Sequence, residues 1–490
     1  MRVLKFGGTS VASAESIKEV VVIVARAVEE DRAVVVVSAL AGVTNRLVVL
    51  VDRVLAGDTK WHPGLEDIRS RHKQELALIG NGNHPEVSRV IDTRVNEIDR
   101  LLTGISLIGE CPQVTGDRIL AAGERLSAPL VAAAFEAYGV RAEVVDGSEL
   151  IEADRGPDGA EVRVEATAGR TIGRLSALDR DIVPVITGFV AADPAGHTIT
   201  LGRGGSDLSA AVLGAALNCD CVEIWTDVNG VMSAPPRVVR EARTLPILSA
   251  AEAAQMAYFG AKVLHPTCLA ALAGRDIPVL IRNTYQPAGD FTVVRQNAGK
   301  QVGVRAVTAV EDVAVFELNR PPGADKEWGQ RLDRVLAEVQ NQLLVVSRTS
   351  AEGDWTFVVP ALAGDRVADR LATQRVDGAM VRRRSSLLAL VGSSVLAQPW
   401  IVGRALEALG KQRITVYGLF AGSTPCAISL LVSPEELGAA LEIVHESLML
   451  GSWANAEPIR QEVENGKEKI ERVYSGGYRQ CRSEAHSPAA

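Results

Sequence analysis

The chain begins with a short apolar strand that ends in a lysine and a pair of glycines. Lys5 is followed by Phe6, Gly7 and Gly8, and residues 13–28 carry a helical pattern that begins at the same point. Glycines leave backbone N–H groups open to an anion, and a helix N-terminus attracts negative charge. A lysine beside them supplies a mobile positive charge for a transferring phosphoryl group. A plain strand and turn has the same outline, so these residues alone leave both interpretations open.

A second glycine-rich segment with charged residues lies further along the chain. Residues 201–210 run Leu-Gly-Arg-Gly-Gly-Ser-Asp-Leu-Ser-Ala and precede an alanine-rich helix predicted over 210–217. Arg203 is suited to a bidentate contact with a carboxylate, and the adjoining glycines open backbone donors. Asp207 would order a substrate ammonium group or Lys5. A plain glycine turn does not need both charges, so the pattern favours a second anion site.

Two further segments carry polar groups suited to an amino acid. Ser38 and Thr44 belong to a loop over residues 37–45 that follows a β-branched strand. Hydroxyl groups in such a place suit an amino-acid carboxylate, although a loop that only caps the next helix has the same composition. Glu124 stands beside Arg125 at a predicted helix start and would bind an ammonium group. The alternative is an acid that favours the helix dipole and pairs with its neighbour.

Polar groups also follow a buried strand and a helix near the middle of the chain. The strand ends in Thr226 and Asp227, and Lys262 follows the helix. Together these groups would bracket a nucleotide. With Lys5 and Arg203 they supply local cations of the kind needed to bring ATP and an anionic substrate together. A solvated lysine at a helix end is the alternative for Lys262.

Composition narrows the class of protein. A length of 490 residues predicts two to four domains, and 52 basic against 60 acidic side chains give a net charge of −8. That balance argues against a sequence-independent nucleic-acid surface. We find no signal sequence and no apolar run long enough to span a bilayer, so we expect a cytoplasmic protein that binds neither nucleic acid nor membrane. The six cysteines are scattered without metal-ligand spacing, so we expect reduced thiols and no metal site.

These residues must be positioned by an α/β region in the first part of the chain. The alternation of strands and helices predicts a mainly parallel sheet covered by helices, with ligands at the carboxyl ends of the strands. Residues 46–117 are predicted to be a charged helical insertion, to which we assign no chemistry. The other elements expected here are strands at 33–38, 142–145, 181–189 and 221–226 and a helix at 127–138.

From about residue 302 the pattern changes to two small units of similar order, which is a weak internal repeat. Each has a strand, a helix and two more strands, as in small regulatory modules. The polar segment 465–490 is predicted to be disordered. In the first unit we expect strands at 312–318, 343–348 and 355–360 and a helix at 328–340; in the second, strands at 386–392, 413–420 and 426–432 and helices at 401–409 and 436–448.

Six motifs, in this order, resemble those of the aspartate kinases in the amino-acid kinase family. They are Lys-Phe-Gly-Gly-Thr-Ser from Lys5, the loop of Ser38 to Asn45, Gly-Glu-Arg-Leu-Ser from Gly123, Leu-Gly-Arg-Gly-Gly-Ser-Asp from Leu201, Trp-Thr-Asp-Val from Trp225, and Phe-Gly-Ala-Lys-Val-Leu-His-Pro from Phe259. The resemblance implies an α/β amino-acid kinase fold over 1–294, including the insertion at 46–117. Two ferredoxin-like ACT-type units would follow, over 302–385 and 386–450.

The same resemblance implies an activity and its ligands. The chain would transfer the γ-phosphoryl group of ATP, with Mg²⁺, to the β-carboxylate of L-aspartate, giving 4-phospho-L-aspartate. This is the first step toward lysine, threonine and methionine. The ACT-type units would bind an amino-acid effector and form a homodimer or a larger homo-oligomer.

The resemblance also carries roles onto particular residues. Catalytic roles would fall to Lys5 and Asp207. Aspartate would be held by Ser38, Thr44, Glu124, Arg203 and Asp207. ATP would be held by Lys5, Gly7, Gly8, Ser206, Thr226, Asp227, Arg237 and Lys262.

The chain departs from the family pattern in the nucleotide segment and in the first ACT-type unit. Met232 stands where the family has tyrosine, and Pro235 stands where it has aspartate. Residues 319–328 are charged and proline-rich rather than hydrophobic. Two alternatives therefore stay open: a kinase paralogue that acts on another amino-acid carboxylate, and a non-catalytic ACT-type amino-acid sensor. The intact charges at Lys5 and Asp207 argue against the sensor.

Overall fold

The computed structural model describes eight stretches of the chain, which fall into two units. Among the described residues, the first unit comprises 1–230 and 264–296, and the second comprises 231–261 and the stretches between 297 and 449. Lys262 and the predicted disordered segment 465–490 lie outside the described residues. The described stretches are 1–156, 159–261, 264–298, 303–319, 327–348, 355–376, 379–421 and 426–449.

The first unit is built on a mainly parallel sheet, as predicted. Its strand order within the unit is β12-β11-β9-β1-β2-β6-β3, and β1 pairs in parallel with both β2 and β9. Of the pairs between these seven strands, β11–β12 is antiparallel and the other five are parallel. The strands are β1 (Arg2–Phe6), β2 (Ala33–Val37), β3 (Ala142–Val145), β6 (Val183–Thr187), β9 (Cys221–Thr226), β11 (Val279–Asn283) and β12 (Thr292–Arg295).

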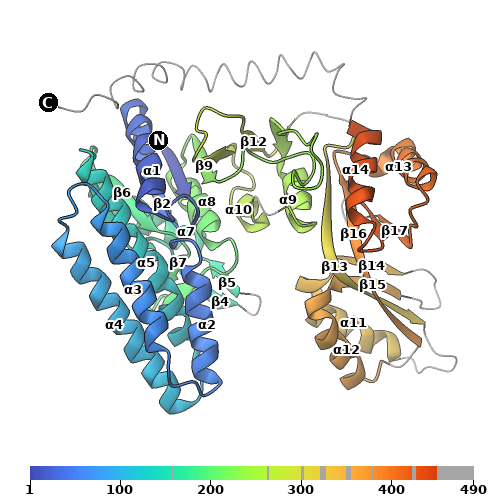
Figure 1. The fold of residues 1–490 in the computed structure, drawn as a ribbon, viewed down its shortest axis with the longest axis horizontal. Helices are drawn as coiled ribbons and strands as arrows, with labels where there is room; N and C mark the ends of the chain where they lie inside the picture. Colours follow the sequence, from blue (N-terminus) through green and yellow to red (C-terminus); the bar gives the residue numbers. More distant parts are fainter. Residues whose placement is uncertain are drawn as a thin grey trace. The chain divides into compact units, whose positions relative to one another are not determined.

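Helices cover both faces of this sheet (Figure 1). On β1, alternation sends Leu4 and Phe6 into the core shared with one helical layer, whereas Val3 and Lys5 face the opposite layer. The first layer holds α1 (Ala14–Glu30) and α5 (Gln113–Ala137), and the second holds α7 (Val164–Ser176), α8 (Gly205–Leu217) and α10 (Pro266–Ala271). Because Lys5 faces the second layer, its side chain is directed toward α8.

The predicted helical insertion at 46–117 contains most of α2 (Val43–Leu55), all of α3 (His62–Ala77) and α4 (Pro85–Ile108), and these three helices pack with α5. Apolar side chains at helical spacing on α4, such as Ile91, Val95 and Ile98, join the core of the first layer. In the described part of the chain, no helix is both long and apolar enough to cross a membrane.

Short elements complete the first unit. The hairpin β7 (Val190–Ala192) and β8 (Thr198–Thr200) leads directly into the second glycine-rich segment. Helix α6 (Gly147–Leu150) and the hairpin β4 (Ala153–Gly156) with β5 (Gly159–Val162) precede α7.

The second unit is built on an antiparallel sheet of order β14-β15-β13-β16-β18-β17, with two long strands at its centre. Helices α11 (Trp328–Glu338) and α12 (Gly364–Thr373) pack on one half, and α13 (Pro399–Lys411) and α14 (Leu437–Met449) pack on the other. The strands are β13 (Ala306–Asn319), β14 (Val345–Arg348), β15 (Trp355–Pro360), β16 (Ala379–Val391), β17 (Gly418–Ala421) and β18 (Ala427–Val432). Two strand–helix–strand–strand–helix repeats thus share one sheet, which agrees with ACT-type units.

The second unit also incorporates residues 231–263, including β10 (Ile247–Ser249) and α9 (Ala250–Tyr258). Ala234 and Val239 lie in the core of α13 and α14, and Oγ of Ser233 lies 3.0 Å from Nε2 of His445 on α14. This division differs from the predicted domain boundary at residue 294. The prediction followed the order of elements along the chain, whereas these contacts join residues that are far apart in the sequence. The assignment of 1–294 to catalysis stays a prediction.

The sequence expectations about α5 and β17 are wrong. Glu124 does not lie at a helix start but midway along α5, which runs unbroken through both glycines of its first half. The strand expected over 413–420 begins only at Gly418. The cause is Arg413, whose backbone φ of 59° is in the left-handed region and so continues the turn that ends α13.

We predict that Phe316→Ala destabilises the second unit by about 3–5 kcal/mol, because the removed ring leaves a cavity. Phe316 is fully buried and stacks on Phe357 with ring centroids 5.0 Å apart. Hydrogen exchange of β13 and β15 measures the loss for this unit separately from the first. Leu362→Ala, at a fully exposed side chain, is the control. Equal exchange in the two variants would contradict the packing described.

Candidate functional site

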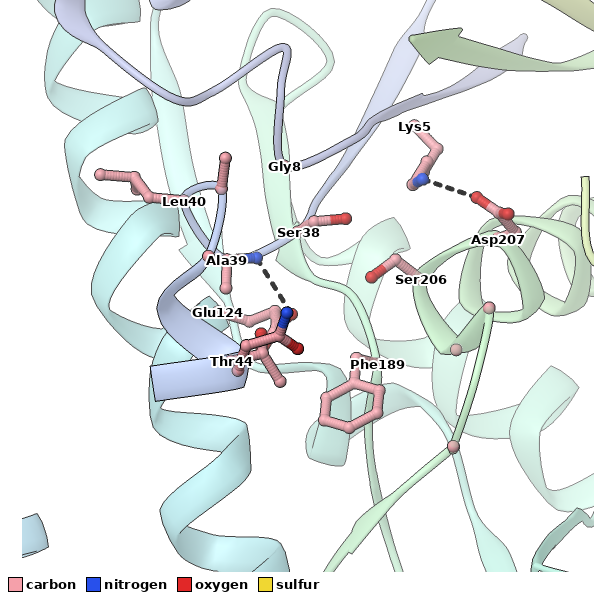
Figure 2. Close-up of a pocket in the computed structure, with 16 residues that line it drawn as sticks. Lys5, Gly8, Ser38, Ala39, Leu40, Thr44, Glu124, Phe189, Ser206 and Asp207 are labelled. Carbon is pink, nitrogen blue, oxygen red and sulfur yellow. Dashed lines mark hydrogen bonds and ion pairs between the residues drawn. The ribbon is translucent and has the colours of Figure 1, made fainter. Parts of the chain in front are cut away.

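A cavity of about 300 Å³ lies beside the end of β1 in the first unit. Its walls come from β1, from the loop that follows β2, from α5, and from the glycine-rich segment before α8 (Figure 2). The strands pair in parallel, so their carboxyl ends meet at this edge. Seven predicted site residues line the cavity: Lys5, Gly8, Ser38, Thr44, Glu124, Ser206 and Asp207.

An ion pair joins the two strongest sequence motifs across this cavity. Nζ of Lys5 lies 2.6 Å from Oδ1 of Asp207, and their side chains are only 11% and 13% exposed. The predicted contact between these residues is therefore present (Figure 2). Asp207 lies in the first turn of α8, where the helix dipole favours a carboxylate. The carboxylate of Asp207 thus balances the charge of Lys5 when no anion is bound, and Lys5 is available to an anion that enters the cavity.

Glu124 faces the same cavity from α5 and has a different electrostatic state. Its Oε1 accepts a hydrogen bond from the N–H of Ala39 at 3.0 Å, and its Oε2 has no hydrogen-bond partner among the residues that the structure describes. Burial raises the pKa of Glu124 to about 8, against the lowering effects of the Ala39 N–H and of the charges on Lys5 and Arg125. A buried carboxyl with one unpaired oxygen is suited to receive a cationic donor.

Glycines at the cavity are required by close approaches of the backbone. A Cβ on Gly8 would lie 2.9 Å from the carbonyl oxygen of Ala39, and a Cβ on Gly204 would lie 2.3 Å from Cβ of His265. Gly204 also has a φ of 68° as the residue that caps α8. This cap starts the helix at Gly205, earlier than predicted, and so places Ser206 and Asp207 in its first turn.

Four other predicted site residues belong to the first unit but do not line the cavity. The N–H of Gly7 donates to the carbonyl of Trp225 at 3.1 Å, so a phosphate contact from this amide would need that bond to open. Arg203 is exposed in the turn before α8. Thr226 and Asp227 lie at the carboxyl end of β9, next to β1, with Oγ1 of Thr226 3.1 Å from Oδ1 of Asp227.

The last two predicted site residues cannot be joined to this cavity. Arg237 is exposed in a turn of the second unit. Lys262 lies outside the described residues. Their predicted contacts with ATP therefore stay predictions.

The sequence analysis missed Phe189, which lines the cavity (Figure 2). Its φ of 68° is unusual for a bulky residue, and its N–H donates to Oγ of Ser209 at 2.9 Å. The signal available in the sequence was Gly188 at the end of a predicted strand. A Cβ there would lie 2.9 Å from Cβ of Ser206.

Two named proteins are similar to nearly the whole chain. A bifunctional aspartokinase/homoserine dehydrogenase of Haemophilus influenzae is 30% identical over 466 residues, which are 91% of this chain and 56% of that protein. Aspartokinase 1, chloroplastic, of Arabidopsis thaliana is 29% identical over 498 residues, covering 94% of this chain and 84% of that protein. The chain spans about half the length of the bifunctional relatives that it matches, between 50% and 56%.

The folded chain is similar to a solved structure as well. The crystal structure of E. coli aspartokinase III in complex with aspartate and ADP matches with a TM-score of 0.76 and 26% sequence identity. The match covers 91% of this chain and 99% of that one. The model of the amino acid kinase family matches residues 1–283, a range that contains every residue of the cavity. The sheet, the cavity and this match agree, and the chain belongs to the amino acid kinase family.

Proposed function

We propose that the chain is an aspartate kinase, which transfers the γ-phosphoryl group of ATP to the β-carboxylate of L-aspartate. One observation carries the proposal: a largely buried, paired lysine shares one cavity with a buried carboxyl, one oxygen of which has no hydrogen-bond partner in the described part of the chain. The similarity to aspartokinase III, whose structure contains aspartate and ADP, supports the choice of substrates.

The proposed reaction needs no strong base, because a carboxylate is already an ionised nucleophile at neutral pH. The protein must instead offset the repulsion between two anions and hold them in line. Lys5 would release Asp207 in part and neutralise charge on the transferring group. Ser206, in the first turn of α8, would add a hydroxyl donor where the helix dipole also favours negative charge.

Recognition of the amino acid would divide between the two sides of the cavity. Glu124 would lose its proton and bind the substrate ammonium group through Oε2, which has no other partner among the described residues. Ser38 and Thr44, which line the same wall, would donate hydroxyl groups to a carboxylate. Arg203 would reach the second carboxylate from its exposed turn.

Mg²⁺ would enter with the nucleotide. In the described part of the chain, no group of three or more His, Cys, Asp or Glu side chains is arranged to hold a metal ion. Mg²⁺ is commonly coordinated by substrate phosphates together with only one or two protein carboxylates. A Mg²⁺ ion bound to ATP therefore needs no larger cluster of protein ligands. Asp227, at the end of β9, is a carboxylate that would be available to it.

The C-terminal sheet would serve regulation. Aspartokinase III is also solved with lysine and aspartate, and that structure matches with a TM-score of 0.71 and 27% identity over 92% of this chain. By analogy we propose an amino-acid effector site on the second unit. Assembly of homo-oligomers through its ACT-type units remains a prediction.

The proposed function is tested by acyl phosphate formation. MgATP is incubated with aspartate, glutamate and related acids, and the product is trapped with hydroxylamine. Activity confined to aspartate is expected. Activity with another acid would favour the paralogue, and no activity with any acid would favour the non-catalytic sensor.

Lys5→Ala is expected to lower kcat by at least about a hundredfold, because a cation that stabilises the transition state is removed. Trapped hydroxamate measures the rate. Lys73→Ala is the matched control, since Lys73 also forms an ion pair, with Asp92 at 2.8 Å, but on the helical insertion. Near-normal turnover of Lys5→Ala would remove this lysine from the mechanism.

The rate should depend on the protonation of Glu124. The carboxyl is mostly neutral below its pKa of about 8, and only the ionised form pairs with an ammonium group. We therefore expect kcat/KM for aspartate to rise about tenfold per pH unit below that pKa. Glu124→Gln should be slow and lack this rise. A pH-independent kcat/KM in the unmodified protein would exclude the ammonium-binding role.

A further inference from the structure

Helix α3 of the helical insertion contacts the two loops that border the cavity. On Arg71, Nη1 donates to the carbonyl oxygen of Ala41 at 2.7 Å and Nη2 donates to that of Ala12 at 3.1 Å. One turn further along the same helix face, Oε2 of Glu75 accepts from the N–H of Ala14 at 2.7 Å. The sequence analysis assigned no chemistry to this insertion, yet it holds both loops.

The two loops already touch at their inner ends. We name residues 7–13 the glycine turn and residues 38–42 the serine loop. The N–H of Ala41 donates to the carbonyl of Gly8 at 3.1 Å, and both loops contribute cavity-lining residues. Arg71 joins the same two loops at a second place, so they are linked both directly and through one planar guanidinium.

The contact with Ala41 also fixes the direction of the next amide. In a trans peptide the C=O and N–H groups point in opposite directions. With the carbonyl of Ala41 directed at Arg71, the N–H of Gly42 is directed away from it. Gly42 lines the cavity, and its N–H has no acceptor among the described residues. The backbone φ of Gly42 is 82°, in the left-handed region, which glycine adopts readily because it has no Cβ.

We propose that Arg71 is a positioning residue that orients the Ala41–Gly42 peptide, so that the N–H of Gly42 donates to a carboxylate of the amino-acid substrate. The inference rests on the proposed function and adds to it a donor and the residue that aims the donor. Two loops without regular structure lose entropy when they are held in one arrangement, and a forked donor holds two carbonyls with one side chain. A lysine in the same place would carry the charge without the fork.

The test compares Arg71→Met with Arg69→Met in the full chain. Arg69 is the matched control, because it lies on the same helix and makes three polar contacts, to Glu66, Asp92 and Asn96. None of these three reaches either loop. The first measurement is hydrogen exchange of peptides that cover the glycine turn and the serine loop. Arg71→Met should exchange about ten- to a hundredfold faster there, and Arg69→Met should match the unmodified protein.

Kinetics provide the second measurement. For Arg71→Met we expect KM for the acid substrate to rise about tenfold or more, with a smaller change in KM for ATP. Arg71→Lys should recover part of the loss, and it replaces Arg71→Met if that variant does not fold. Unchanged loop exchange and unchanged KM for the acid substrate in both Arg71 variants would overturn the positioning role.

Failure of this inference can be told from failure of the proposed function. If the unmodified protein forms no acyl phosphate, the aspartate kinase proposal fails, and loop exchange still decides whether Arg71 holds the loops. Activity in the unmodified protein with equal effects of Arg71→Met and Arg69→Met would keep the proposed function and reject the positioning role.

Discussion

The cavity depends on a close approach of three backbones around Ala39. The carbonyl oxygen of Ala39 lies 2.9 Å from where Gly8 would carry a Cβ, and its methyl group lies 2.8 Å from where Gly123 would carry one. The N–H of the same residue holds Glu124. A side chain at either glycine would push the loop after β2 away from β1 or from α5. Two glycines without side chains therefore set the width of the site and the orientation of its buried acid.

The charged groups of the cavity differ in their electrostatic environment. Lys5 and Asp207 neutralise each other at 2.6 Å, whereas burial keeps Glu124 largely protonated at neutral pH. The two carboxyl groups of one cavity thus have different surroundings, a cationic partner for Asp207 and burial for Glu124, which is how environment assigns different roles to the same chemical group. A chain of net charge −8 can offer a site to anions in this way, because the local balance matters more than the total.

The second unit holds more than the predicted regulatory modules. Met232 and Arg237 of the nucleotide motif belong to this unit, and the neighbouring Ala234 and Val239 pack in the core of α13 and α14. Oγ of Ser233 accepts a hydrogen bond from the N–H of Arg243 at 3.0 Å. The carbonyl oxygen of Ser233 accepts one from the N–H of Val307 at 2.8 Å. A change in the C-terminal sheet would therefore act on this segment through direct contacts. The departures at Met232 and Pro235 lie in a part of the chain whose environment is the C-terminal core.

The sequence by itself determined the local elements and the chemistry of the motifs: the strand, glycine turn and helix after Lys5, the parallel sheet, and Lys5 as one of two candidate partners of Asp207. These features depend on patterns within a few residues, or on motifs that follow one another along the chain in the order found in the family. Only the tertiary structure decided that Glu124 lies midway along a helix, that Phe189 lines the cavity, that Arg71 joins two loops, and that Ala234 and Val239 pack in the C-terminal core. Each of these depends on which distant backbones approach one another, and side-chain periodicity along one segment carries no information about that choice.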